Sequence, residues 1–182
     1  MQFPTSLIPL APTSYDAFFA YLGDQLKDNG QGGTPLFQPM PRAQSTLAPE
    51  RAAAFRLALD TPLGQPGWRR AWIAVGADGI RGHIDLRARP EPHAQHRSML
   101  GMGVHRDWRG KGLGRRLVAL AVQWAHAQDG LDWIDLEVLS VNTPARQLYL
   151  ATGFVQTGEH ADMFRIDGEP HGYTYMSHAL RR

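Results

Sequence analysis

The sequence predicts a mixed α/β fold of the α+β type, in which helices flank a central, mostly antiparallel sheet. Three observations predict it. Alternating segments within residues 70–87 indicate an antiparallel hairpin. A buried strand, a helix, a second strand and a second helix follow in that order over residues 99–153. Two long strand-like segments on either side of Asp167-Gly168 end the chain as a further hairpin.

The first half of the chain predicts a short strand, two helices and the first hairpin. Thr13 or Ser14 can cap the first helix, which Asn29-Gly30 ends. Residues 30–49 are rich in Gly, Pro and Gln and indicate a loop. The turn Ala77-Asp78-Gly79 suits the hairpin. The expected elements are a strand at 6–10, helices from 13 or 14 to about 27 and from 47 to 59, and strands at 70–75 and 80–87.

The second half predicts the alternation of strands and helices and then the final hairpin. Met99–Val104 is apolar on both faces apart from its glycines, which is typical of a central, covered strand. In the next strand, Asp135 and Glu137 share the face opposite the apolar residues. Thr143 is expected to cap the second helix, with proline at its first position, and Gly153 to end it. The expected elements are a strand at 99–104, a helix at 113–127, a strand at 133–139, a helix from 144, and strands at 154–165 and 173–180.

Composition excludes several kinds of site. The 182 residues are the size of one domain, and we expect residues 1–182 to form a single one. The absence of cysteine excludes a disulfide scaffold, a cysteine nucleophile and a thiolate zinc site. The eight histidines form no ligand pattern, so we expect no metal.

The N-terminal segment and the hydropathy predict a cytoplasmic protein. The segment MQFPTSLIPLAP lacks a basic region, and prolines interrupt its short apolar stretch, so we expect no signal peptide. No run approaches the roughly 18 apolar residues that suggest a membrane span, so we expect no membrane partner.

The charged residues are unevenly placed. The formal net charge is +2, but five of the residues from Arg106 to Arg116 are basic and one, Asp107, is acidic. A nucleic-acid-binding surface would combine basic residues with exposed aromatic ones, and Trp108 is the single aromatic residue in this cluster. We therefore expect no nucleic-acid partner and look for a local reason for the cluster.

The segment Arg109-Gly110-Lys111-Gly112-Leu113-Gly114 has the properties of an anion-binding helix start. It joins the buried strand to the next helix, where the first N–H groups lack partners and the helix dipole is positive. Its glycines let an anion approach that backbone. Arg115 and Arg116 oppose the dipole unless an anion is bound. The pattern favours a phosphate-bearing ligand over the alternative, a solvated basic turn whose glycines reverse the chain.

Two other phosphate-binding loops do not fit this segment. A Walker A loop needs Gly five residues before its Gly-Lys pair and Ser or Thr after it, but His105 and Gly112 stand at those positions. A dinucleotide fingerprint needs G-x-G-x-x-G near the first strand, whereas this segment is G-x-G-x-G and lies past the middle of the chain.

The segment and its neighbours resemble the GCN5-related N-acetyltransferase (GNAT) family. Arg109-x-x-Gly112-x-Gly114 looks like the R/Q-x-x-G-x-G/A acyl-CoA loop of that family. The similarity covers about residues 70–180. It is carried further by Leu100-Gly-Met-Gly-Val104, by Val138-Leu-Ser-Val-Asn142-Thr-Pro-Ala-Arg146, by Leu148-Tyr149 and by Gly153-Phe154.

The end of the chain is similar to one branch of the family, the amino-acid and ribosomal-protein acetyltransferases. The similarity lies in residues 158–176, with Asp167-Gly168 and Tyr173-x-x-Met176. Where that branch commonly shows Tyr-x-Asp, this chain has His171-Gly172-Tyr173, which weakens any inference about the substrate.

The resemblance implies a GNAT-like fold with two splayed parallel strands at a cofactor cleft, and acetyl-CoA as the cosubstrate. Backbone groups of Met102, Gly103 and Val104 would pair with the pantetheine arm as another strand does. The side chains of Lys111, Arg115 or Arg116 could reach the phosphates. Asn142 would contact the cofactor arm. The pyrophosphate would be held by the backbone N–H groups of Arg109, Gly110, Lys111, Gly112, Leu113 and Gly114.

The resemblance also implies a general acid, Tyr149, which would protonate the departing thiolate. By its spacing alone, Tyr149 could equally be a core aromatic of an amphipathic helix. A backbone N–H near Val104 could stabilise the developing oxyanion. The general base stays open: Glu137 is the candidate we select. The alternatives are Asp135, Asp85, His83, His105 or a chain of water molecules.

These features predict an N-acetyltransferase that moves the acetyl group of acetyl-CoA to a primary amine by direct attack in a ternary complex. We expect the acceptor to be a small amino-acid-like molecule, with a protein N-terminus as the second alternative. The alternative from another class is a non-catalytic domain that binds acyl-CoA as a sensor or serves in assembly. Many members of the family are homodimers, and the resemblance implies a homodimer here.

Overall fold

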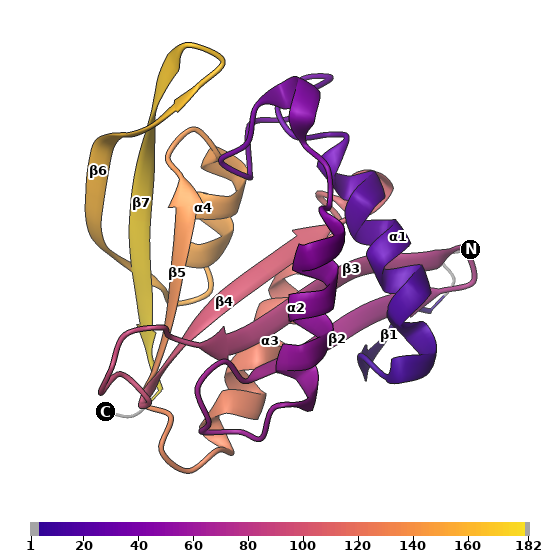
Figure 1. The fold of residues 1–182 in the computed structure, drawn as a ribbon, viewed down its shortest axis with the longest axis vertical. Coiled ribbons are helices and arrows are strands. Elements are labelled where there is room, and N and C mark those ends of the chain that lie inside the picture. Colours follow the sequence, from indigo (N-terminus) through magenta and orange to yellow (C-terminus); the bar gives the residue numbers. More distant parts are fainter. Residues whose placement is uncertain (1–3, 181–182) are drawn as a thin grey trace.

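Figure 1 shows the fold of the computed structural model, which describes residues 4–180. The strands are β1 (Ser6–Pro9), β2 (Arg69–Gly76), β3 (Gly79–Ala88), β4 (Arg97–Val104), β5 (Trp133–Leu139), β6 (Val155–Ile166) and β7 (Glu169–Ala179). The α-helices are α1 (Tyr15–Leu26), α2 (Pro49–Asp60), α3 (Leu113–His126) and α4 (Thr143–Leu150). Short 3₁₀ turns lie at Pro12–Ser14, Arg42–Gln44 and Arg106–Trp108.

The strands form one sheet in the order β1-β2-β3-β4-β5-β7-β6. All neighbouring pairs are antiparallel except β4 and β5, which run parallel. These two strands pair only between Arg97–Met99 and Trp133–Asp135 and then separate, as Figure 1 shows. This is the mixed, mostly antiparallel sheet with splayed parallel strands that the sequence predicts.

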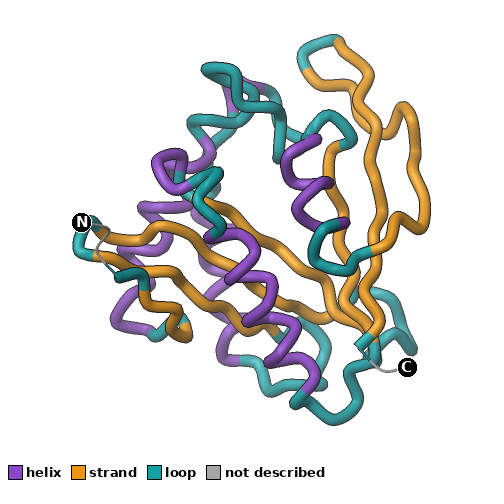
Figure 2. Tube along the Cα trace, turned by 180° about the vertical axis from the view of Figure 1, so that it is seen from behind, coloured by secondary structure: helices purple, strands orange, loops and turns teal. Residues whose placement is uncertain are grey.

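Helices cover both faces of the sheet. Helices α1 and α2 lie over β2 and β3 on one face, and α3 lies on the opposite face (Figures 1 and 2). Along α3, buried residues such as Leu113, Leu117 and Ala121 recur at helical spacing and pack into the main core. Phe18 of α1 packs against Ile73 on the other side. Each large apolar side chain removed from water in this way stabilises the fold by about 1.5–3 kcal/mol.

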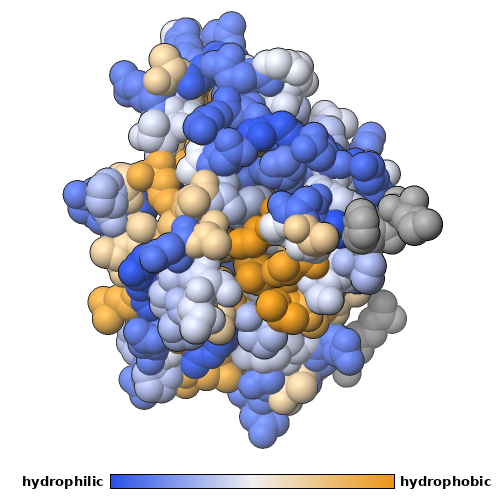
Figure 3. All heavy atoms as spheres, turned by 90° about the vertical axis from the view of Figure 1, so that its right-hand side faces the viewer, coloured by the Kyte–Doolittle hydropathy of each residue, from blue (hydrophilic) through white to orange (hydrophobic). Residues whose placement is uncertain are grey.

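One side of the molecule shows an apolar area within a polar surface (Figure 3). Figure 3 shows the side that carries α1 and β1, where apolar atoms gather near the centre of the view within polar surroundings. Ile8, in the edge strand β1, is one of the large apolar residues that the described chain exposes. Between residues 4 and 180, no helix combines the length and the apolar character needed to cross a membrane.

The connection between α1 and α2 passes from one half of the sheet to the other. Asn29 is fully buried and holds this connection in shape: its side-chain oxygen accepts the N–H of Phe37 at 2.8 Å. Leu36 is buried in a small cluster with Leu139 and Ile166, at the far end of β5 and β6. The connection therefore lies across the top of the opening between β4 and β5 (Figure 1).

A second contact fixes the same connection to the β6–β7 turn. The Arg42 guanidinium donates from Nη1 to Asp167 Oδ2 at 2.8 Å, and the Arg42 N–H donates to the same oxygen at 3.1 Å. Asp167 and Gly168 have positive φ angles of 52° and 83°. These angles fit the two-residue hairpin turn that was predicted at this position.

Some details of the predicted elements are wrong. The last strand begins at Glu169, four residues before the predicted start, and Ser14 precedes α1 without a side-chain cap bond. Two other departures concern β4 and the start of α4. Met99–Val104 is not covered along its whole length: burial ends at Leu100, because β5 leaves β4 at Met99. The cap of α4 is Asn142 and not Thr143, since the Asn142 side chain accepts the N–H of Ala145 at 3.4 Å. Both departures lie at the opening between β4 and β5.

Candidate active site

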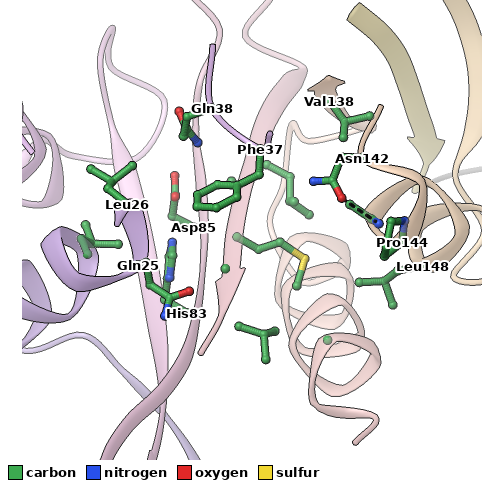
Figure 4. Close-up of a pocket in the computed structure, with 18 of the residues that line it drawn as sticks. Gln25, Leu26, Phe37, Gln38, His83, Asp85, Val138, Asn142, Pro144 and Leu148 are labelled. Carbon is green, nitrogen blue, oxygen red and sulfur yellow. Dashed lines mark hydrogen bonds between the residues drawn. The ribbon is translucent and has the colours of Figure 1, made fainter. Parts of the chain in front are cut away.

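A cleft of about 1120 Å³ lies where β4 and β5 separate. Its walls come from the end of β4 with the glycine segment, from α4, and from the α1–α2 connection. Figure 4 shows Asn142, Pro144 and Leu148 on one side of the cleft and His83 and Asp85 on the other, with Phe37 and Gln38 between them. The cleft thus has a glycine-segment end and an end beneath the α1–α2 connection.

The glycine segment presents unpaired backbone N–H groups. Among residues 4–180, no backbone carbonyl accepts the N–H groups from Gly110 to Arg115. Gly110 and Gly112 have φ angles of 71° and 79°, and a Cβ at either would meet no heavy atom within 4 Å. Consecutive amides in such a turn at a helix start form a concave site for an anion. The turn is open, as an anion site requires.

The side chain of Arg109 faces the protein. Its Nε donates to the Val104 carbonyl at 3.1 Å, and its Nη2 donates to Asp28 Oδ2 at 3.1 Å. A further bond joins Nη1 to the Thr34 hydroxyl at 3.2 Å. The Arg109 N–H is also engaged, at 3.4 Å from the Arg106 carbonyl. Arg109 therefore joins the end of β4 to two points of the α1–α2 connection.

The other basic residues of the cluster take different positions. Arg115 lines the cleft and donates to the Ala151 carbonyl at 3.2 Å. Arg116 donates to the Thr5 carbonyl at 2.9 Å, next to the edge strand β1. The Lys111 ammonium lies 5.0 Å from the centre of the Trp108 ring. Of Lys111, Arg115 and Arg116, Arg115 is therefore the one placed at the cleft.

The free edge of β4 offers backbone groups to the cleft. The His105 N–H donates to the Arg81 carbonyl of β3 at 2.9 Å. Because backbone groups of successive residues alternate in direction along an antiparallel pair, the N–H and C=O of Gly103 also point toward β3. Those of Met102 and Val104 point toward the open edge of β4. Since Arg109 occupies the Val104 carbonyl, the backbone groups left for a ligand are both groups of Met102 and the Val104 N–H. Gly103 instead accepts a hydrogen bond from the Tyr21 hydroxyl at 3.2 Å.

Tyr149 reaches the cleft from α4 and is 7 % exposed. Its ring packs against Phe154 with centroids 5.7 Å apart. Burial raises the pKa of the Tyr149 hydroxyl, and the nearby Asp85 charge raises it further. The hydroxyl therefore carries its proton at neutral pH and can act as a donor toward the cleft.

Asn142 lines the cleft at the start of α4. Its side-chain oxygen is engaged in the cap described above, and Figure 4 shows its amide nitrogen directed into the cleft. The residue can thus hold the helix start and still donate to a ligand.

Glu137 and Asp135, which were predicted to share one face of β5, have different surroundings. Glu137 is exposed and lines the cleft beside Tyr173, whose pKa is raised to about 12 by burial and by the Glu137 charge. Asp135 is buried and accepts hydrogen bonds from Arg97 Nε at 2.7 Å and from Ser177 at 2.7 Å. Burial works against ionisation of Asp135, but these bonds lower its pKa on balance. Asp135 is therefore a structural carboxylate.

The remaining base candidates are less free than Glu137. Asp85 is 4 % exposed and lies between Arg69 and Arg87. Burial lowers the pKa of His83 to about 4, against the opposing effect of Asp85, and its Nδ1 lies 3.3 Å from the Tyr21 hydroxyl. His105 uses Nδ1 to accept the N–H of Asp107 at 3.3 Å.

Several residues at the cleft were not predicted from the sequence, namely those of the α1–α2 connection and Arg87 of β3, whereas His83 and Asp85 were named only as alternative bases. Phe37 and Gln38 lie in a segment without periodicity, and no sequence signal marks them. His83, Asp85 and Arg87 alternate along β3, and this polar stripe on a strand of the central sheet was a visible signal of a functional face.

The fold and the cleft define an acetyl-transferring enzyme. The model of the Acetyltransferase (GNAT) family matches residues 41–154, more than half of the chain, and the chain belongs to this family.

Individual relatives agree with this membership. The chain is 26% identical over 150 residues to the uncharacterized N-acetyltransferase YycN of Bacillus subtilis (strain 168), covering 82% of this chain and 94% of the relative. An acetyltransferase of the GNAT family from Streptococcus pneumoniae has a TM-score of 0.79 at 20% identity, with 97% of this chain and 99% of that chain covered. The spermidine N-acetyltransferase from Vibrio cholerae, solved with CoA and spermine, has a TM-score of 0.71 at 16% identity, with coverage of 97% and 95%.

Proposed function

We propose that the protein transfers the acetyl group of acetyl-CoA to the primary amine of a small amino-acid-like molecule, by direct attack in a ternary complex. One observation carries this proposal: unpaired amides at a helix start, an unpaired strand edge and a buried tyrosine all face one cleft. We take the whole chain, 1–182, as one such domain, a cytoplasmic one that works as a homodimer.

The chain's groups fit acetyl-CoA, which supplies the activated thioester. The amides from Gly110 to Gly114 would hold the pyrophosphate, and Arg115 would reach a phosphate from the same helix start. The backbone of Met102 would pair with the pantetheine arm along the free edge of β4. Asn142 would donate to the same arm.

The acyl transfer needs a base, an oxyanion donor and an acid. Glu137 would take a proton from the acceptor ammonium, directly or through water, so that the amine nitrogen can attack the thioester carbonyl. The Val104 N–H would stabilise the developing oxyanion. As the N–C bond forms and the C–S bond breaks, Tyr149 would give its proton to the leaving sulfur. The nitrogen would lose its second proton back to Tyr149 through water, yielding free CoA thiol, the acetylated amine and a tyrosine ready for the next turnover. The raised pKa of Tyr149 makes the proton transfer to sulfur uphill, and burial of the thiol in the same cleft would raise the thiol pKa and lessen the difference.

The α1–α2 connection supports a small acceptor over a protein N-terminus. It lies over the end of the cleft opposite the glycine segment, which we call the acceptor end, and it is held there by the bonds between Arg42 and Asp167. A bound polypeptide would need a continuous path past this contact. Within the family we therefore place the chain nearer to the acetyltransferases of free amino acids than to those of ribosomal proteins.

Thiol release from acetyl-CoA with a panel of primary amines tests the proposal. We expect turnover in the wild type and a loss of about 10²- to 10⁴-fold in kcat for Tyr149→Phe, the range of a general acid. The Kd of CoA should stay within a factor of about two, because phenylalanine preserves the packing against Phe154. Stabilisation by CoA against heat, with no turnover of any amine, would instead favour the non-catalytic sensor.

A further inference from the structure

We infer that the acceptor carries a carboxylate close to its amine, and that Arg87 and Arg51 bind this carboxylate. The inference rests on the proposed function and names the substrate class of the same cleft. It arises from an excess of arginine at the acceptor end, which we call the acceptor arginines: Arg51, Arg69 and Arg87.

Two acceptor arginines face each other across neighbouring strands. Arg69 of β2 and Arg87 of β3 are direct partners in the antiparallel register. Like charges in that position destabilise a sheet unless an anion lies between them. Asp85 supplies one, with Oδ2 at 3.2 Å from Arg69 Nε and 3.3 Å from Arg87 Nη1. One buried carboxylate is thus shared by two guanidinium groups.

The third acceptor arginine adds to the excess of positive over negative charge. Arg51 lines the same cleft from α2, and its guanidinium makes no ion pair with a carboxylate in the part of the chain that the structure describes. Burial lowers the pKa of Arg69, Asp85 opposes this, and the charges of Arg87 and Arg51 lower it further, so all three arginines act on one region. The acceptor end therefore carries three cations and one committed carboxylate, with Glu137 as the other acidic group.

Arg87 lines the cleft close to the backbone of β4. Gly101 of β4 lies opposite Asp85 in the register, and a Cβ on it would come 2.7 Å from Asp85 Oδ1 and 3.0 Å from Arg87 Nη1. The absence of a side chain at Gly101 lets Arg87 lie against the β4 backbone, beside the edge proposed for the thioester. The side chain of Arg87 is 35% exposed, so its guanidinium is not sealed from a ligand.

Glu137 lies on the same face of the sheet. Arg87 pairs with Met99, and Met99 pairs with Asp135, two residues before Glu137 on β5. Both Glu137 and Arg87 are close enough to Tyr173 to affect its pKa, in opposite directions. An amino-acid zwitterion would match this pair of charges, with its ammonium at Glu137 and its carboxylate at Arg87 and Arg51. A polyamine would find three cations and one available carboxylate.

Thiol release with three acceptor classes tests the inference. The panel holds free L-amino acids, the corresponding amino-acid amides, and spermidine, each with saturating acetyl-CoA. We expect the wild type to prefer free amino acids to their amides. Arg87→Gln and Arg51→Gln should each lower kcat/KM for free amino acids by about ten- to a hundredfold, as expected for a lost charge-assisted hydrogen bond, and should lower the values for amides by a much smaller factor.

Arg165→Gln is the matched control, because Arg165 is an exposed residue of β6 that pairs with Asp162 away from the cleft. The control should retain the wild-type preference. Turnover of amides or spermidine at least as fast as of free amino acids would overturn the inference and leave the proposed acetyl transfer intact. An absence of thiol release with every amine, in a protein that still binds CoA by calorimetry, would overturn both.

Discussion

Replacing Asp85 with asparagine removes the carboxylate that Arg69 and Arg87 share, without changing the side-chain volume. Breaking a fully buried ion pair by removing one partner costs about 3–5 kcal/mol, because the remaining charge stays buried without compensation. Asp85 is 4 % exposed, but the side chains of Arg69 and Arg87 are 18% and 35% exposed, so water screens part of that cost. We expect a loss of about 2–3 kcal/mol in the free energy of unfolding.

For a chain of this size, 1 kcal/mol corresponds to about 2–4 °C in Tm, so the variant should melt about 4–12 °C below the wild type. Thermal unfolding followed by circular dichroism measures this difference. Asp162→Asn is the control, since Asp162 forms a surface pair with Arg165 and its removal should cost at most about 1 kcal/mol. Equal melting temperatures for Asp85→Asn and the control would refute the reasoning that Asp85 balances buried arginines.

Two further predictions concern the glycine segment and the response to pH. Gly112→Ala should weaken CoA binding, as measured by calorimetry. The φ angle of 79° at Gly112 strains an alanine by about 1–2 kcal/mol, and relaxation of the backbone would turn its N–H groups away from the ligand. An unchanged Kd would contradict the proposed phosphate site. Because the pKa of His83 is lowered to about 4 in the folded chain, the unfolded state binds more protons between pH 6.5 and 4. Stability should therefore fall by up to about 3 kcal/mol as the pH falls through that window, and denaturant titrations of His83→Gln should show a weaker dependence.

Much of the fold could be predicted because its signals are local. Strand alternation, helical spacing along α3 and the Asp167-Gly168 turn each depend on a few adjacent residues. The glycine segment was found for the same reason, since an anion site at a helix start is built from consecutive backbone amides.

The rest depends on contacts between distant residues. The pairing of Asp85 with Arg69 requires the register of β2 against β3, and the bond between Arg42 and Asp167 joins segments 125 residues apart. The role of Arg109 was hidden because a motif position does not say where a side chain points. The acceptor end of the cleft is assembled from such contacts, so the sequence indicated the cofactor and a general acceptor class but not the residues that would bind the acceptor.

The short junction between β4 and β5 supports both ends of the cleft. Arg97 of β4 and Asp135 of β5 are joined there by two hydrogen bonds, and Arg89 adds a third at 3.0 Å. Beyond this junction, the distance between the two strands depends on the angle at which they diverge, and the junction fixes that angle. A loosened junction would change the width available to the cofactor arm and to the acceptor together, so the affinities for both would vary in concert.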